Sequence, residues 1–230
     1  MKNLFKHITI AGLTSAMLMF SACRDVKSYI SGNLVSLPDG KVCLYGYDGT
    51  LTAMDSTTSH NGRFTLTQPQ ALPDLAFVGF ESLPDLLVPV LLDGSRVYIS
   101  GNLNYKDDIT VSGTKANDEL REYTLSIRNT DIMARAIEIE LDTMDPTEDS
   151  VRYAQMKAKR DSLRNSIARS RSEFVRRNPS SLVSAMFLDM SFNDSMTRQQ
   201  VDSLINCLDS TTVDNAFLQR LRFRLEHVEN

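Results

Sequence analysis

The chain has 230 residues, of which 42% are hydrophobic and 23% are charged, and its formal net charge is −4 at pH 7. These proportions are typical of a foldable globular protein and exclude a wholly disordered chain. The mild acidity and the lack of a nucleic-acid-binding motif in the sequence exclude nucleic acid as the main partner.

The N-terminal segment is typical of an export signal. Lys2 and Lys6 form a basic start, and a run of mainly apolar residues follows over 8–20. This run is too short to cross a hydrocarbon layer, which needs about 20 apolar residues. We therefore predict a lipoprotein signal peptide over 1–22 that is removed from the mature protein.

Cys23 directly follows two small residues, Ser21 and Ala22. Small residues let an extended chain enter a signal peptidase, and the thiol of Cys23 is a nucleophile for lipid attachment. We predict lipidation at Cys23, which anchors the protein to a membrane without a spanning helix. The expected location is the cell envelope, at the outer membrane and facing the periplasm. An ordinary secretory signal followed by a coincidental cysteine is the alternative.

The part of the chain from 27 to 113 consists of short β-rich segments separated by turn signals. The turn signals are Pro38-Asp39-Gly40, Asp48-Gly49, Asn61-Gly62 and Asp93-Gly94. Glycine supplies the positive φ that tight turns need, and Asp or Asn tolerates it. The predicted strands span 29–37, 41–47, 50–60, 63–68, 75–80, 87–92, 96–100 and 108–112. We predict that these strands form an antiparallel β-sandwich-like domain over 23–113, linked as hairpins.

From about residue 117 the apolar period becomes helical. The first stripe is formed by Leu120, Tyr123, Ile127, Ala134, Ile137 and Leu141. Pro146 interrupts this helix, and a second helical segment is predicted over 147–177. Its apolar residues are Val151, Leu163, Ile167 and Phe174. The two segments are predicted to pair as an antiparallel helical hairpin.

Shorter helices are predicted after Asn178-Pro179, since the residue before a proline avoids the α region. The segment 181–190 is nearly continuously apolar, and 197–200 has the order of a capping box. The last segment presents Phe217, Leu218, Leu221, Leu225 and Val228 on one face. We expect that face to be buried if the chain is complete and exposed if a domain is missing. The chain as a whole is predicted to be an α+β protein with an α-helical region over 114–230.

The second long helical segment is strongly basic. Its cations include Lys157, Lys159, Arg160, Arg164, Arg169, Arg171, Arg176 and Arg177, against Asp161 and Glu173. A basic amphipathic helix can lie on anionic lipid. We favour the other interpretation, in which acids of the neighbouring helix neutralise these cations, because long paired helices carry complementary charges. The candidate acids are Glu138, Glu140 and Asp142.

Two further cysteines, Cys43 and Cys207, lie far apart in the sequence. Neither belongs to a Cys-x-x-Cys pair, which dithiol exchange would need. Each has apolar sequence neighbours, so we predict that both behave as small structural hydrophobes. A disulfide between them, which an oxidising compartment permits, is the alternative.

The histidines of the mature chain, His60 and His227, have no metal-ligating partner nearby in the sequence, so we predict no metal site. Asp55 and Ser56 together with His60 contain the residue types of a hydrolytic triad. However, neighbouring strand residues alternate faces, and no nucleophile-elbow glycines flank Ser56. A turn or strand-edge role is favoured for Asp55-Ser56. We therefore expect no catalytic residue and no cofactor, although a site assembled from residues distant in sequence stays open.

A set of short motifs occurs along the chain in one order. They are the lipobox ending at Cys23, Ile30-Ser31-Gly32, Lys41-Val42-Cys43-Leu44, Asp55-Ser56, Asn61-Gly62-Arg63-Phe64, Leu92-Asp93-Gly94, and the segments 111–117 and 177–184. In this order the chain resembles Bacteroidetes lipoproteins in which an N-terminal β domain of unknown function precedes helices and a thioredoxin-like domain. The resemblance covers nearly the whole mature chain. The sequence has no Cys-x-x-Cys and no tryptophan, which that redox domain carries, so we do not extend oxidoreductase activity to it.

Two hypotheses about function follow from these observations. The first is a non-enzymatic, lipid-anchored envelope protein that acts as a binding or scaffold module. The second is an accessory subunit that works in trans with a thioredoxin-like thiol:disulfide oxidoreductase, since the proteins it resembles carry that domain in cis. A truncated paralogue without a separate role is a third possibility.

Overall fold

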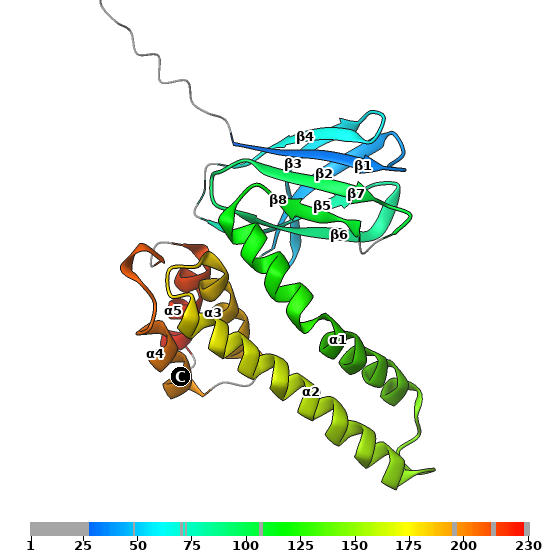
Figure 1. The fold of residues 1–230 in the computed structure, drawn as a ribbon, viewed down its shortest axis with the longest axis vertical. Helices are drawn as coiled ribbons and strands as arrows, with labels where there is room; N and C mark the ends of the chain where they lie inside the picture. The colour runs from blue at the N-terminus through cyan, green and yellow to red at the C-terminus, as the bar shows by residue number, and fades with distance from the viewer. Residues whose placement is uncertain are drawn as a thin grey trace, which may run out of the picture.

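The structure is a computed structural model, and it describes residues 28–47, 49–69, 71, 73–105, 108–194, 197–212 and 215–227. The predicted signal peptide over 1–22 and the predicted lipid site at Cys23 lie outside these residues. Within the described residues, eight strands come first and five α-helices follow (Figure 1). This order confirms the α+β fold class.

The strands lie close to where the turn signals predict them. They are β1 (Tyr29–Val35), β2 (Gly40–Tyr47), β3 (Leu51–Ser59), β4 (Arg63–Thr67), β5 (Asp74–Phe80), β6 (Leu83–Leu92), β7 (Val97–Asn102) and β8 (Thr110–Ser112). In β4, Phe64 and Leu66 are buried while the residues between and beside them are exposed. This alternation places one face of the strand in the core and the other in solvent.

The strands form two four-stranded sheets, with the orders β4-β1-β7-β8 and β3-β2-β5-β6. Most neighbouring pairs are antiparallel, as predicted, but β1 and β7 run parallel. The chain passes from one sheet to the other after β1, so β1 and β2 do not form a hairpin. Turn signals report only on strands that are adjacent in sequence, so the pairing of β1 with β7 is not visible in them.

The core of the sandwich lies between the two sheets. Its buried residues include Ile30, Leu44, Phe64, Val78, Val90 and Ile99. In both sheets the last strand in the order, β6 or β8, forms one edge, and both edges contact helix α1 (Lys115–Thr143). Helix α1 therefore begins beside the side of the sandwich where β6 and β8 form the edges of the two sheets (Figure 1).

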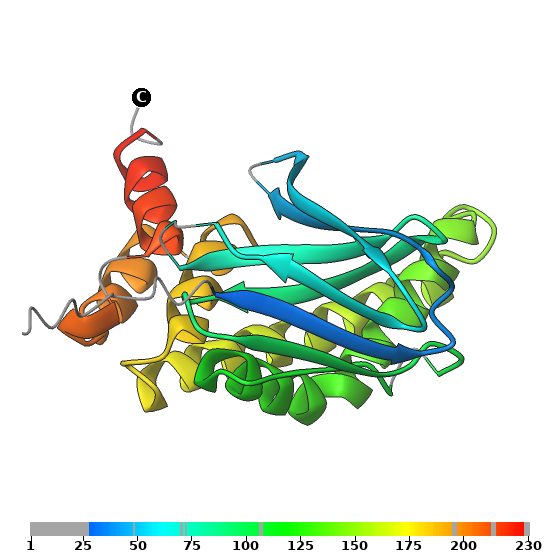
Figure 2. The ribbon, with the colours of Figure 1, turned by 90° about the horizontal axis from the view of Figure 1, so that it is seen from above.

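Helix α1 and helix α2 (Ser150–Arg177) form the predicted hairpin. Thr114 caps the start of α1, because its side chain accepts a hydrogen bond from the backbone N–H of Asn117. Helix α2 begins three residues later than predicted, because Asp149 is its N-cap and Asp145 holds Thr147 in a turn. Seen from above, the hairpin lies beneath the strands (Figure 2).

The hairpin buries one side of each helix. Tyr123, Ala134 and Leu141 of α1 are buried, as predicted, and so is Ile167 of α2. The prediction for Val151 is wrong, since 67% of its surface is exposed. Among the residues that the structure describes, no helix has the length and apolarity needed to span a membrane.

Two arginines of α2 bond to acids of α1, as the favoured interpretation of the basic segment predicts, whereas Arg160 and Arg177 bond to acids of α2 itself. Arg164 donates to both carboxylate oxygens of Glu138, over 2.9 and 2.6 Å, and to Asp131 over 3.0 Å. Arg152 donates to Glu140 over 2.5 Å. These ion pairs connect the two helices of the hairpin along their length.

A second core joins the sandwich to the C-terminal helices. These helices are α3 (Leu182–Asp194), α4 (Arg198–Ile205) and α5 (Ala216–His227), with a 3₁₀ turn at Ser210–Thr212 before the last. Thr197 and Gln200 form the predicted capping box of α4. The predicted apolar face of α5, formed by Phe217, Leu218, Leu221 and Leu225, is buried in this core, while Val228 lies outside the described residues.

An ion cluster fixes α5 to the sandwich and to α3. Arg220 of α5 donates to both carboxylate oxygens of Asp74 in β5, over 2.7 and 2.8 Å, and to Asp189 of α3 over 3.2 Å. Arg224 also donates to the carboxylate of Asp189. Burial raises the pKa of Asp189, and the two arginines oppose that shift. The cluster connects residues that are far apart in sequence, so it forms a joint between the β and α parts.

Candidate functional site

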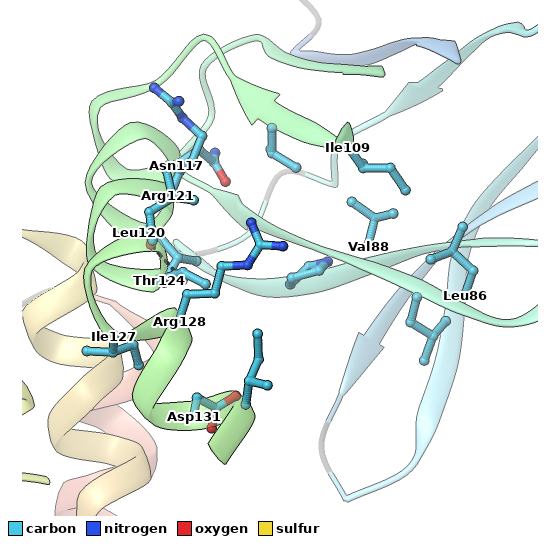
Figure 3. A pocket seen from close by; sticks show the side chains of 15 residues that line it. Leu86, Val88, Ile109, Asn117, Leu120, Arg121, Thr124, Ile127, Arg128 and Asp131 are labelled. Carbon is cyan, nitrogen blue, oxygen red and sulfur yellow. Dashed lines mark hydrogen bonds between the residues drawn. The ribbon is translucent and has the colours of Figure 1, made fainter. Parts of the chain in front are cut away.

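A groove of about 410 Å³ lies between the open edge of the sandwich and the first half of α1 (Figure 3). Helix α1 begins against β8 and then runs obliquely away from the strands (Figure 1). The space between the helix and the edge strands therefore widens like a wedge. A hollow of this size is within the range of ligand-binding clefts.

The walls of the groove are mainly apolar. They consist of Leu86, Leu87, Val88 and Pro89 from β6, Ile109 and Val111 from the β8 side, and Leu120, Leu125, Ile127 and Ile132 from α1. Ile109 and Val111 also pack against the sandwich core, so the groove leads to the interior of the sandwich. Leu125 and Ile132 are 54% and 53% exposed. The groove thus leaves large apolar side chains in contact with water.

Charged side chains of α1 border this apolar surface. Arg121 is exposed, and Arg128 extends from the helix into the space in front of β6 (Figure 3). The carboxylate of Asp131 accepts hydrogen bonds from Arg135 over 2.7 Å and from Arg164 over 3.0 Å. Arginines of α1 and α2 therefore already hold this acid at the border of the groove.

Asn117 closes the narrow end of the groove, and it is only 2% exposed. Its side-chain oxygen accepts a hydrogen bond from the backbone N–H of Leu91, and its amide nitrogen donates to the carbonyl of Leu91, each over 2.9 Å. The amide nitrogen also donates to the hydroxyl of Thr114 over 2.8 Å. The side chain of Asn117 therefore replaces one residue of a neighbouring strand along the edge of β6.

The remaining edge of β6 faces the groove. Backbone groups in a strand alternate in direction, so Leu87 and Pro89 direct theirs to the same side as Leu91, away from β5. Proline has no N–H. The edge therefore offers the N–H and carbonyl of Leu87 and the carbonyl of Pro89, and no strand of the described part of the chain pairs with it.

The cysteines singled out in the sequence occupy different environments. Cys43 is buried on β2, as predicted, but Cys207 is exposed after α4, so its assignment as a buried hydrophobe is wrong. The apolar neighbours of Cys207 turn inward while its own side chain lies on the solvent side of the turn. Both are free thiols.

The polar residues near His60 have structural contacts. Asp55 accepts a hydrogen bond from the backbone N–H of Thr67 over 2.6 Å, which confirms its strand-edge role. His60 lies 3.5 Å from Asp39, and both side chains are exposed. A backbone hydrogen bond from Asn61 and the proximity of His60 lower the pKa of Asp39. Among the described residues, no group of three or more His, Cys, Asp or Glu side chains is placed to hold a metal ion.

None of the groove residues was identified as a site from the sequence. Two signals for them exist. Leu125, Ile132 and Ile139 recur every seven residues on α1, on a different side from the stripe that packs on α2. In addition, a proline within a predicted strand, Pro89, is typical of a sheet edge.

Among known protein families, one model matches the chain, and it covers the N-terminal part. Residues 29–120 match the family model "Domain of unknown function (DUF4369)". The match covers all eight strands and the start of α1, including the contact between Asn117 and Leu91. The predicted β domain of unknown function is thereby supported. No curated protein and no solved structure matches the chain.

Proposed function

We propose that this chain is a non-enzymatic binding module held at a membrane of the cell envelope by lipid on Cys23, and that its binding face is the groove between α1 and the edge strands. The groove carries this proposal. It combines exposed large apolar side chains with an edge of β6 that no strand of the described residues pairs with. Exposed apolar surface of this kind marks interaction sites in soluble domains.

The form of the hairpin supports this binding face. Its inner stripe packs α1 against α2, whereas Leu125 and Ile132 lie on another side of α1 and face the wedge. Because these two side chains remain half exposed, the folded chain lacks roughly 1 to 3 kcal/mol of stabilisation that their full burial would contribute. A binding partner that fills the groove recovers this free energy.

The proposed anchor rests on the sequence around Cys23. Lipidation there would hold the module at the outer membrane, facing the periplasm. We expect Cys23→Ala to lose lipid labelling and to move from the membrane fraction to the soluble fraction of the native host. Equal labelling of the variant and the wild-type protein would contradict the anchor but would leave the groove untouched.

The binding face is tested by crosslinking from defined positions. A photoreactive residue in place of Leu125 is expected to form specific adducts in the envelope of the native host. The same residue in place of Val151, which is exposed on α2 and outside the groove, is the matched control and is expected to form none. Adducts of equal yield from both positions, or from neither, would contradict the proposed binding face.

The adducts also distinguish the two hypotheses about the partner. Recovery of a thioredoxin-like protein with a Cys-x-x-Cys motif would support the alternative, in which the chain is an accessory subunit of a thiol:disulfide oxidoreductase. Recovery of partners without such a motif supports the binding or scaffold module.

A further inference from the structure

We propose that a polar hollow between helices α2 and α4 binds a phosphate monoester, and that Arg169 and Arg176 hold its phosphate group. The hollow has a volume of about 560 Å³. It shares no lining residue with the groove between α1 and the edge strands. A ligand bound there therefore adds to the proposed function and does not depend on it.

The two arginines lie on the same side of α2. Seven residues make almost two full turns of a helix, so positions 169 and 176 face the same way. A rise of about 1.5 Å per residue separates their Cα atoms by about 10 Å along the helix axis. Ser172, between them, also lines the hollow. The hollow therefore lies in front of a small side chain that two cations flank.

Arg169 and Arg176 differ from the other arginines of α2, all of which have partners. Acids of α1 or α2 pair with Arg152, Arg160, Arg164 and Arg177, and the ring of Phe187 lies next to the guanidinium of Arg171. Glu173 lies between positions 169 and 176 in the sequence, but its carboxylate bonds to Arg177. With the described residues, neither Arg169 nor Arg176 forms a hydrogen bond or an ion pair, and both are exposed. These two guanidinium groups are therefore available to a ligand.

The rest of the lining consists mainly of neutral polar groups. Helix α4 contacts α2 and supplies the amides of Gln199 and Gln200 and the hydroxyl of Ser203. The Oε1 atom of Gln200 accepts a hydrogen bond from the backbone N–H of Thr197, so its amide nitrogen remains as a donor. Asn165 of α2 adds another amide. Since none of the described residues that line the hollow is an aspartate or a glutamate, the hollow presents two positive charges and no negative one.

This combination matches a phosphate monoester. Such a group carries a charge of about −1.5 to −2 at pH 7 and three strong acceptor oxygens. Arginine is suited to it because the guanidinium forms two parallel hydrogen bonds with phosphate oxygens. A carboxylate carries a single negative charge and two oxygens, so it would neutralise only one of the two arginines. The hollow therefore favours a phosphate monoester over a carboxylate.

The size of the hollow indicates that the phosphate is attached to a larger polar group. A water molecule takes up about 30 Å³ in the liquid, so a phosphate group alone would leave most of the hollow unfilled. The amides of Asn165, Gln199 and Gln200 can both donate and accept hydrogen bonds, as the hydroxyl groups of a sugar or of glycerol do. The ligand is therefore a phosphate monoester of a hydroxylated compound, either dissolved or in the headgroup of a lipid.

The first test measures binding of glucose 6-phosphate to the detergent-solubilised full chain by isothermal titration calorimetry. We expect Arg169→Ala and Arg176→Ala each to weaken binding at least fivefold, and the double variant to abolish it. The matched control is Arg222→Ala, at an exposed position of α5 outside the hollow, and it should change the affinity less than twofold. Circular dichroism and the urea midpoint check that all variants fold.

A second measurement leaves the protein unchanged and compares ligands. Glucose lacks the phosphate group, and glucuronate carries a carboxylate in its place. Both are expected to bind the wild-type chain at least tenfold more weakly than glucose 6-phosphate. This comparison separates recognition of the phosphate from recognition of the sugar and from a general attraction of anions.

A third measurement identifies the source of the phosphate. The full chain is placed in phosphatidylcholine nanodiscs that contain either phosphatidic acid, whose headgroup is a phosphate monoester, or phosphatidylglycerol, a diester. If the natural ligand is a lipid headgroup, phosphatidic acid competes and weakens binding of glucose 6-phosphate at least fivefold, whereas phosphatidylglycerol does not. If the natural ligand is dissolved, the affinity is the same in both kinds of nanodisc.

Three outcomes would overturn the phosphate site. They are no binding of glucose 6-phosphate at millimolar concentration, equal binding of glucuronate, and equal binding to the folded double variant of Arg169 and Arg176. None of these outcomes changes the crosslinking expected from position Leu125, so the phosphate site and the proposed function can fail separately.

Discussion

At the scale of single residues, close packing in the sandwich depends on a glycine beside an aromatic ring. Gly32 on β1 lies against Phe64 on β4, and the two residues are register partners. A Cβ atom built on Gly32 would overlap the Cε1 and Cζ atoms of the Phe64 ring. Phe64 in turn packs edge to face with Phe80, with 5.8 Å between the ring centroids. The ring is therefore held from two sides.

We predict that Gly32→Ala lowers the free energy of unfolding by about 1 to 3 kcal/mol, because the Phe64 ring must move in a close-packed core. Gly40→Ala is the matched control, since a Cβ atom there meets nothing within 4 Å. It should change the free energy by less than about 0.5 kcal/mol. Urea unfolding at equilibrium measures both, and equal effects would contradict the packing argument.

Asn117 carries a second prediction at this scale. Asn117→Ala leaves the N–H and carbonyl of Leu91 buried without partners and is expected to cost about 2 to 3 kcal/mol. Asn117→Asp should be no better, because a carboxylate oxygen then faces the carbonyl of Leu91. The control is Asn129→Ala, at an exposed position of the same helix. Thermal unfolding that is unchanged in Asn117→Ala would show that the edge of β6 needs no partner.

Single-residue environments were only partly predictable from the sequence. Cys43 lies between Val42 and Leu44 on β2, and these apolar neighbours predict its burial correctly, because all three residues are buried. Cys207 lies in a turn after α4, where sequence neighbours do not share a face, so its apolar neighbours were misleading. Asp55 was recognisable as an edge residue, but its partner Thr67 is supplied by another strand.

At the scale of elements, the helical hairpin has two apolar faces, and the sequence predicts the packing partner of only one of them. The 3.6-residue period of the inner stripe predicts the pairing of α1 with α2. The complementary charges were also predictable, and Arg164 indeed bonds to Glu138. The outer stripe through Leu125 and Ile132 has a clear spacing, but its neighbour is the edge of the sandwich, which lies earlier in the chain.

The ion pairs of the hairpin lead to a pH-dependent prediction. Hydrogen bonding from Arg164 lowers the pKa of Glu138 below its ordinary value of 4.5. A carboxyl with a lowered pKa in the folded state adds stability above pH 4.5, and this stability is lost as the pH falls through the lowered pKa. We expect Glu138→Gln to be less stable than the wild-type chain at pH 7, and we expect this difference in stability to be smaller at pH 3.

The measurement for this prediction is thermal unfolding at both pH values in low salt. Glu148→Gln, at an exposed position in the turn before α2, serves as the control and should show no such convergence. Because the ion pair of Arg164 and Glu138 is partly exposed, the difference in stability between Glu138→Gln and the wild-type chain at pH 7 should also decrease in 1 M salt. A difference between Glu138→Gln and wild type that is the same at pH 3 and pH 7 would contradict the ion-pair argument.

At the scale of the whole molecule, the β and α parts meet through a shared core and a set of ions. Leu91 on the outer face of β6 packs among residues of the helices, such as Val183 and Leu218. Next to this core, Arg220 bonds to Asp74 and Asp189. This joint holds the C-terminal helices at one end of the sandwich, as Figure 2 shows for α5.

We predict that Arg220→Ala lowers the free energy of unfolding by about 1 to 3 kcal/mol, because Asp74 and the buried Asp189 lose their shared cation. The control is Arg222→Ala, at an exposed position of the same helix, and it should leave the free energy of unfolding unchanged. Because Arg220 holds α5 against β5 and α3, limited proteolysis should cut the chain of Arg220→Ala faster near α5. Equal cleavage of both variants would show that the shared core alone forms the joint.

Periodicity, turn residues and caps are local properties, so the sequence by itself determined the eight strands, the hairpin, the capping box of α4 and the α+β class. The long-range arrangement was decided only by the tertiary structure. The parallel pairing of β1 with β7, the exposure of Val151 and the groove each depend on residues that are distant in sequence. A pattern within one segment reports which of its faces is apolar. Which surface covers that face depends on how all the elements pack together, and along β6 and α1 the chain leaves it partly uncovered.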